Sequence, residues 1–165
     1  MPKHPFSSEI HFWRLDSAPC AKTWNLGIGA EKVGGRWNPR GQATVYASLD
    51  AATAILEVAV HKGFESLDAK PYVLTQVKVL DPTTVFVVEP STVSNPNWLA
   101  PGTPSRSQQH YGGELLEQHP FVLVPSSVSR HSWNLLMNPA LAHGQYELVA
   151  QEAFALDGRL NPPLV

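Results

Sequence analysis

The stretch TVYASLDAATAILEVAVH, residues 44–61, decides the fold because it holds a strand and a helix in direct succession. Residues 44–47 form a short run of β-favouring residues, and Ser48 and Asp50 then offer oxygen side chains that can cap the start of a helix. From residue 51 to residue 61 the apolar residues recur at helical spacing, and Gly63 is a residue type that commonly ends helices. The sequence therefore predicts a helix over residues 51–61 with a strand immediately before it.

Outward from this stretch, short β-type runs alternate with turns, and 15 prolines punctuate the chain. Strands are expected at residues 11–15, 72–79, 84–88 and 121–124, in the segment 133–137 and in the strand-like material of 146–156. Residues 22–35 are polar and rich in glycine, and we expect residues 27–29 to be a loop. Residues 89–113 carry several prolines with many Ser, Asn and Gly, which predicts a long irregular connection. The pattern indicates a mixed fold with more strand than helix.

The size and charge of the chain limit what it can be. With 165 residues, of which 43% are hydrophobic, it can bury the core of one domain. Charged residues make up 16% of the chain and the formal net charge is −2. Proteins that bind nucleic-acid phosphates concentrate Lys and Arg in one footprint, and this sequence lacks one.

The cysteine and histidine usage bears on compartment and metals. Cys20 is the single cysteine, so no internal disulfide can form. Residues 1–11 contain no apolar run long enough for a signal peptide or a membrane span, and we therefore expect a cytoplasmic protein. The seven histidines are scattered and never form a pair four residues apart with an acid between them, so we expect no metal site.

Four polar residues occur where a packed element would ordinarily carry an apolar one: Arg36, Tyr46, Glu57 and Ser126. Glu57 lies in an otherwise apolar helical stretch and either faces solvent or interacts with a partner. Arg36 offers a planar fork of donors suited to a diphosphate, or forms a structural salt bridge. Tyr46 is equally compatible with a core tyrosine, and Ser126 with a Pro-Ser turn. The chain has no Gly-x-Ser-x-Gly elbow and no phosphate-binding glycine loop.

Short motifs stand in a fixed order along the chain: FWR (12–14), GGRWN (34–38), VYAS (45–48), LEV (56–58), VPSS (124–127), WNLLMNP (133–139) and FALDGRL (154–160). In this order and spacing the chain resembles the RES domain, the toxin of bacterial RES–Xre type II toxin–antitoxin systems, over residues 12–160. The resemblance implies a single domain spanning residues 1–165. It also implies an α+β fold like that of ADP-ribosyltransferases, with short strands in two small sheets around an NAD-binding cleft and few helices.

The resemblance further implies an enzyme that cleaves the nicotinamide–ribose bond of NAD⁺ without a metal. The Arg, Glu and Ser of the family name fall on Arg36, Glu57 and Ser126, with Ser127 as the neighbouring alternative. Glu57 would stabilise the sugar cation that forms as the bond breaks. Ser126 would hydrogen-bond Glu57 or the substrate.

Substrate positioning is assigned by the same resemblance. Arg36 would hold the diphosphate or ribose of NAD⁺, and the ring of Tyr46 would lie against nicotinamide. Trp37, Asn38 and Asn134 would complete the contacts to the dinucleotide.

The resemblance leaves the acceptor open between water (a glycohydrolase), inorganic phosphate (a phosphorylase) and a protein side chain (an ADP-ribosyltransferase). It implies a cognate antitoxin with a DNA-binding domain as partner, and a homodimer or a hetero-oligomer with that antitoxin. It implies no direct contact with nucleic acid or membrane. A non-catalytic protein-interaction module, in which the polar residues merely form a structural network, is the alternative from another class.

Overall fold

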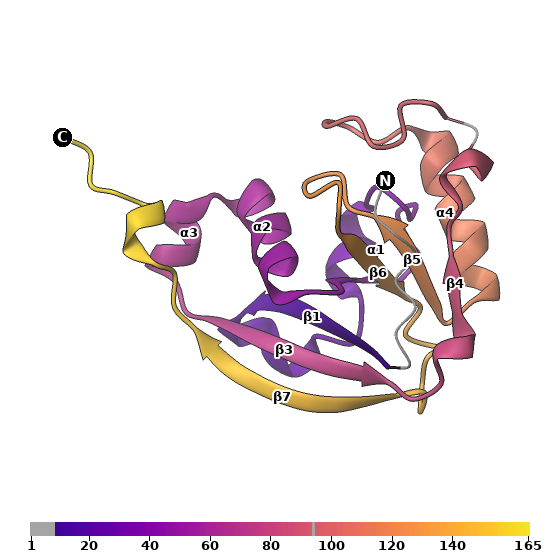
Figure 1. Ribbon diagram of the computed structural model, residues 1–165, viewed down its shortest axis with the longest axis horizontal. Coiled ribbons are helices and arrows are strands. Elements are labelled where there is room, and N and C mark those ends of the chain that lie inside the picture. Colours follow the sequence, from indigo (N-terminus) through magenta and orange to yellow (C-terminus); the bar gives the residue numbers. More distant parts are fainter. Residues whose placement is uncertain (1–8, 94) are drawn as a thin grey trace.

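The computed structural model describes residues 9–93 and 95–165, which form one seven-stranded sheet and four α-helices (Figure 1). The strands are β1 (Ile10–Ser17), β2 (Val45–Ser48), β3 (Tyr72–Val79), β4 (Val85–Val87), β5 (Phe121–Pro125), β6 (Trp133–Met137) and β7 (Tyr146–Phe154). The helices are α1 (Ile28–Val33), α2 (Ala51–Lys62), α3 (Phe64–Ala69) and α4 (Arg106–Gln118). Short 3₁₀ turns occur at Ala18–Thr23, Pro82–Thr84, Pro90–Thr92 and Gly158–Leu160.

The sheet has two wings that meet between β1 and β2. The strand order is β4-β5-β6-β2-β1-β3-β7, and all neighbours are antiparallel except the parallel pair β4 and β5. β1 and β2 are registered only through Trp13 and Ser48, whereas β1 and β3 pair along their whole length. The α+β class with few helices is confirmed. The expected two separate sheets are wrong, because β2 pairs with β6 on one side and with β1 on the other.

Alternation along the strands divides the core between the two faces of the sheet. On β5, Phe121 and Leu123 pack into one cluster, whereas Val122 and Val124 pack into another on the opposite face with Leu116 of α4. α2 and α3 cover the other wing, as Figure 1 shows, where they bury apolar side chains of β1 and β3. The sheet therefore positions α2 and α4 over different wings.

The helix predicted over residues 51–61 is confirmed as α2. Asp50 caps it, since its Oδ1 accepts the backbone N–H of Thr53 at 2.7 Å. The helix ends at Gly63, whose φ of 79° lies in the region that favours glycine and whose N–H donates to the carbonyl of Ala59 at 2.8 Å. Asp50, one of the two N-cap candidates of the sequence, and Gly63, the expected end of the helix, are therefore the residues that cap α2.

The irregular connection expected over residues 89–113 is wrong in its last part, because α4 begins at Arg106. Gly112 and Gly113 lower the helix propensity of this segment, and Gly112 is needed for packing because a Cβ there would overlap the carbonyl oxygen of Trp37. Ser105 caps the helix by accepting the backbone N–H of Gln108 at 3.2 Å. The Ser-x-x-Gln spacing of a capping box was thus the available signal.

Two further short helices lie outside the expectations. α1 begins directly after Gly27, where we expected a loop over residues 27–29, and α3 follows α2 after a single glycine. Each spans only six residues, which is too short for apolar periodicity to reveal it.

The expectation about the amino terminus concerns residues 1–11, of which residues 1–8 lie outside the described residues. No helix within residues 9–93 and 95–165 is long and apolar enough to span a bilayer.

Candidate active site

Polar side chains gather at one end of three neighbouring strands: on β2, on β6 and just after the end of β5. Ser48 on β2 lies opposite Asn134 on β6, and Asn134 lies opposite Val124 on β5. Ser126 follows Val124 by two residues, so Ser48, Asn134 and Ser126 share one face of the sheet. On the same face, Tyr46 lies two residues before Ser48 and Val124 lies two residues before Ser126. Both belong to the apolar cluster beneath α4. The face therefore changes from apolar to polar at this end of the three strands.

Helix α2 brings Glu57 to these polar side chains. The Oε1 atom of Glu57 accepts hydrogen bonds from the hydroxyl of Ser126 at 2.7 Å and from the side-chain amide of Asn134 at 2.6 Å. Of the two serines that the sequence left open, Ser126 is the one that reaches Glu57. We name Ser48, Glu57, Ser126 and Asn134 the Glu57 cluster.

The backbone fixes the direction of the Ser126 hydroxyl. Its Oγ accepts the N–H groups of Val128 at 3.1 Å and Ser129 at 2.9 Å, so its one proton is directed at Glu57. Ser126 is 0% exposed, so no water competes for these bonds. The carboxylate thus meets a donor that is oriented before any ligand arrives.

The other carboxylate oxygen of Glu57 remains open. Within residues 9–93 and 95–165, no group hydrogen-bonds to Oε2, and the residue is half-buried. Sequence reasoning offered solvent exposure or a partner for this carboxylate, and the structure combines the two. Glu57 is thus fixed by hydrogen bonds to Oε1, while Oε2 is available to accept a bond from a ligand.

Tyr46 lies two residues before Ser48 on β2, and its hydroxyl is used inside the protein. It donates to Asn38 Oδ1 at 2.7 Å and accepts the backbone N–H of Trp37 at 3.0 Å. Burial raises the pKa of Tyr46 far above its ordinary value, and the Trp37 N–H and the charge of Arg36 offset this only in part. The phenol is therefore neutral and ties β2 to the segment 36–38. We name Trp37, Asn38 and Tyr46 the Tyr46 cluster.

Trp37 and Asn38, which we expect among the contacts to NAD⁺, are both buried. Trp37 is 3% exposed and packs edge-on against Trp98, with ring centroids 5.4 Å apart. Asn38 is 0% exposed, and its amide donates to the carbonyls of Ala30, Pro39 and Gln42 at 3.0 to 3.1 Å. Both side chains therefore hold the segment 36–38 in place through contacts inside the protein.

Arg36 projects from the same segment and retains free donors. Its NH1 group donates to the carbonyl oxygens of Trp98 at 3.2 Å and Ala100 at 2.9 Å. Its Nε and NH2 groups have no partner among the described residues. The guanidinium can therefore hold the segment 98–100 with one nitrogen and an anion with the others. The salt bridge offered as an alternative for Arg36 is not among the ion pairs of the described residues.

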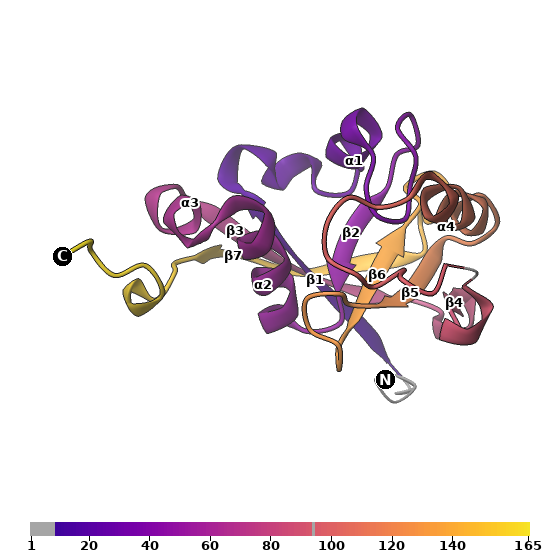
Figure 2. The same cartoon turned by 90° about the horizontal axis from the view of Figure 1, so that it is seen from above.

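Strand β2 connects the Tyr46 cluster, which Arg36 adjoins in sequence, to the Glu57 cluster. Tyr46 and Ser48 lie on one face of this strand, Ser48 donates to Asn134 at 2.8 Å, and Asn134 contacts Glu57. Figure 2 shows α2 beside the loop that joins β5 to β6, with β2 and β6 next to them. Sequence reasoning missed Ser48, although its alternation with Tyr46 in the run VYAS was a usable signal.

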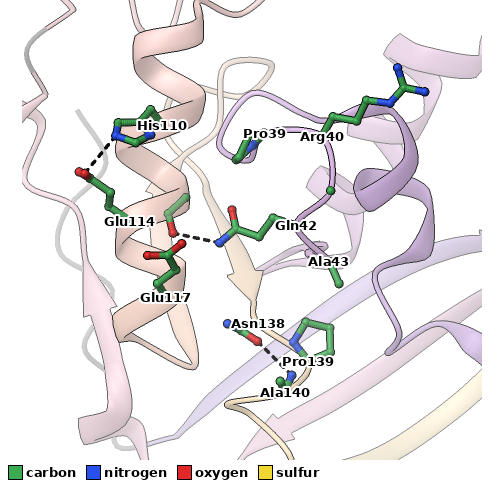
Figure 3. Close-up of a pocket in the computed structure, with 12 residues that line it drawn as sticks. Pro39, Arg40, Gln42, Ala43, His110, Glu114, Glu117, Asn138, Pro139 and Ala140 are labelled. Atoms are coloured by element: carbon green, nitrogen blue, oxygen red, sulfur yellow. Dashed lines mark hydrogen bonds and ion pairs between the residues drawn. The ribbon is translucent and has the colours of Figure 1, made fainter.

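A separate groove lies between the segment 39–43, α4 and the turn 138–140 (Figure 3). Its volume is about 710 Å³, and its acidic lining residues are Glu114, which pairs with His110 at 3.1 Å, and Glu117. None of the residues of the Glu57 cluster lines this groove. In the described part of the chain, no group of three or more His, Cys, Asp or Glu side chains is arranged to hold a metal ion.

Comparisons with known proteins agree on one family. The model of the RES domain matches residues 11–157. "Toxin Res" of Yersinia enterocolitica is 33% identical over 145 residues, covering 86% of this chain and 92% of that protein. "Prs ADP-ribosylating toxin" of Sphingobium sp. (strain YBL2) is 34% identical over 139 residues, covering 78% of this chain and 82% of that protein. The crystal structure of the M. tuberculosis MbcT–MbcA toxin–antitoxin complex contains a chain of the same fold, with a TM-score of 0.69, 19% identity and coverage of 89% of this chain and 85% of that one.

Proposed function

The chain belongs to the RES domain family, and from this premise we propose that it is the toxin of a toxin–antitoxin system that cleaves the nicotinamide–ribose bond of NAD⁺. The observation that carries the proposal is the state of Glu57. One of its oxygens is held by two aligned donors at 2.7 and 2.6 Å, and the other is open. A carboxylate held in this way is prepared to meet a developing positive charge.

Cleavage of this bond requires few catalytic groups besides Glu57. When the bond between the ribose carbon and the pyridinium nitrogen breaks, its electron pair goes to that nitrogen, and nicotinamide leaves as a neutral molecule. The ribose then carries the positive charge, as in glycoside hydrolysis, and the open oxygen of Glu57 stabilises it. Because the leaving group needs no proton, a general acid is not required.

The remaining residues position the substrate. The free Nε and NH2 donors of Arg36 suit the diphosphate of NAD⁺. Tyr46 fixes the segment that carries Arg36, and the stacking of its ring against nicotinamide stays a prediction. Ser126 and Asn134 act on Glu57 and keep its open oxygen in one place.

The acceptor of the ADP-ribosyl group is water or inorganic phosphate in our leading proposal, which makes the reaction a depletion of cellular NAD⁺. Transfer to a protein side chain is the second candidate, and the relative named as an ADP-ribosylating toxin favours it. We further propose that a cognate antitoxin with a DNA-binding domain binds the chain in the cytoplasm. The toxin–antitoxin complex that contains a chain of the same fold supports such a partner.

The test is to incubate the purified protein with NAD⁺ and to measure free nicotinamide, first in water, then with phosphate, then with cell lysate and NAD⁺ labelled on its adenosine. Release in water gives ADP-ribose, release that requires phosphate gives ADP-ribose with a phosphate on the carbon that bore nicotinamide, and release that requires lysate gives labelled protein. Absence of release under all three conditions would overturn the proposed function and favour the interaction module.

A further inference from the structure

Ser48 belongs to the Glu57 cluster, but among the described residues its hydroxyl bonds to Asn134 and not to Glu57. Ser48 and Asn134 are directly opposite each other on β2 and β6, and the hydroxyl of Ser48 donates to Asn134 Oδ1 at 2.8 Å. The other end of the same amide donates to Glu57 at 2.6 Å. Ser48 is 2% exposed, so it has no access to a substrate and water does not replace its bond.

The direction of each bond follows from the carboxylate. Glu57 only accepts hydrogen bonds, so the NH₂ end of the Asn134 amide must face it. Oδ1 of Asn134 then faces Ser48, which must donate. Asn134 is half-buried, and without a donor at Oδ1 its amide is free to rotate toward solvent and away from Glu57.

The two donors of Glu57 are thus oriented by different means. The hydroxyl of Ser126 is oriented by the backbone N–H groups of Val128 and Ser129. The amide of Asn134 is oriented by a side chain, that of Ser48. Loss of either orienting contact would leave Glu57 Oε1 with one fixed donor.

We propose that Ser48 is a positioning residue that locks the side-chain amide of Asn134 and, through it, the carboxylate of Glu57. Ser48 touches neither substrate nor the reacting atoms. Its effect on turnover rests on the proposed function, whereas its effect on the Asn134 amide does not.

The kinetic test compares Ser48→Ala with Asn134→Ala and with the double variant. Ser48→Ala should lower kcat for nicotinamide release about tenfold, the size of one net hydrogen bond, and change KM little. The double variant should be no slower than Asn134→Ala alone, because Ser48 acts through Asn134. Losses that multiply in the double variant, or an unchanged kcat in Ser48→Ala, would overturn the proposal.

Two further variants separate orientation from folding. Ser48→Cys fills the same space with a weaker donor, so its loss of kcat should be smaller than that of Ser48→Ala. Thr75→Val is the matched control, because Thr75 is a fully buried strand hydroxyl that also bonds a side-chain amide, that of Gln151 at 3.0 Å, on the other wing. It should leave kcat unchanged, and an equal loss in Thr75→Val would reduce Ser48 to a structural role.

The second readout requires no NAD⁺ cleavage. The side-chain NH₂ signals of Asn134 in a ¹H–¹⁵N NMR spectrum are identified by their disappearance in Asn134→Asp. The proton that faces Glu57 should resonate downfield, as expected of a short charge-assisted bond, and should move upfield in Ser48→Ala but not in Thr75→Val. An unmoved signal in Ser48→Ala would refute the positioning role even in an active enzyme. A wild-type protein that releases no nicotinamide would refute the proposed function and leave this measurement valid.

Discussion

The Glu57 cluster and the Tyr46 cluster are linked through β2, yet they differ in how fully their central polar groups are hydrogen-bonded. The Tyr46 hydroxyl donates to one buried group and accepts from another, which uses it completely. Glu57 is bonded through one oxygen and leaves the second open. A satisfied buried network gives rigidity, whereas an oriented group with free capacity gives a place for chemistry.

The groove between the segment 39–43, α4 and the turn 138–140 (Figure 3) contrasts with the Glu57 cluster. It offers a volume of about 710 Å³ and two glutamates, but both carboxylates are exposed, and Glu114 pairs only with the exposed His110 among the described residues. Gln42 donates from its Nε2 to the carbonyl of Gly113 at 3.0 Å, and its Oε1 is buried without a partner among the described residues. Converging donors therefore mark the candidate site better than the size of a hollow does.

The largest effect should come from removing the open charge. Glu57→Gln keeps an oxygen for Ser126 and Asn134 but removes the negative charge that meets the ribose, so kcat for nicotinamide release should fall by about 100-fold or more with a nearly unchanged Tm. The exposed Glu117→Gln in the groove is the matched control and should retain full turnover. Undiminished turnover in Glu57→Gln would remove Glu57 from the mechanism.

A smaller effect should follow from moving the segment that the Tyr46 cluster holds. In Gly112→Ala the new Cβ would overlap the carbonyl oxygen of Trp37, which costs about 1–3 kcal/mol of unfolding free energy. The displaced segment carries Arg36, so KM for NAD⁺ should rise more than kcat falls. Urea unfolding and steady-state kinetics measure the two quantities. Gly29→Ala has open space around its Cβ and should leave both unchanged or raise stability slightly.

How much of the fold the sequence predicts depends on how local each signal is. Helix α2 and strand β3 were predicted because caps and periodicity lie within the elements themselves. Helix α4 was not, since Gly112 serves a close contact with Trp37, a residue far away along the chain. The single sheet likewise depends on the long-range pairing of β2 with both β1 and β6.

The candidate site shows the same division. The identities of Arg36, Glu57 and Ser126 followed from the family resemblance, whereas their contacts did not. Ser126 and Glu57 are 69 positions apart in the sequence, and only the folded sheet brings the two side chains into contact. The burial of Trp37 and Asn38 could not be predicted from the sequence, because it depends on segments that are far away along the chain.

The smallest effect should come from the hydroxyl of Tyr46. Tyr46→Phe retains the ring but leaves the buried Asn38 Oδ1 and the Trp37 N–H without their partner, which costs about 1–3 kcal/mol of unfolding free energy. Because Glu57 and its donors stay in place, kcat should fall only a few-fold, far less than in Glu57→Gln. Tyr46→Leu removes the ring as well, and a much larger rise in KM for NAD⁺ in that variant would support the stacking of the ring on nicotinamide. If Tyr46→Phe lost as much kcat as Glu57→Gln, the phenol would belong to the chemistry and the contrast between the two clusters would fail.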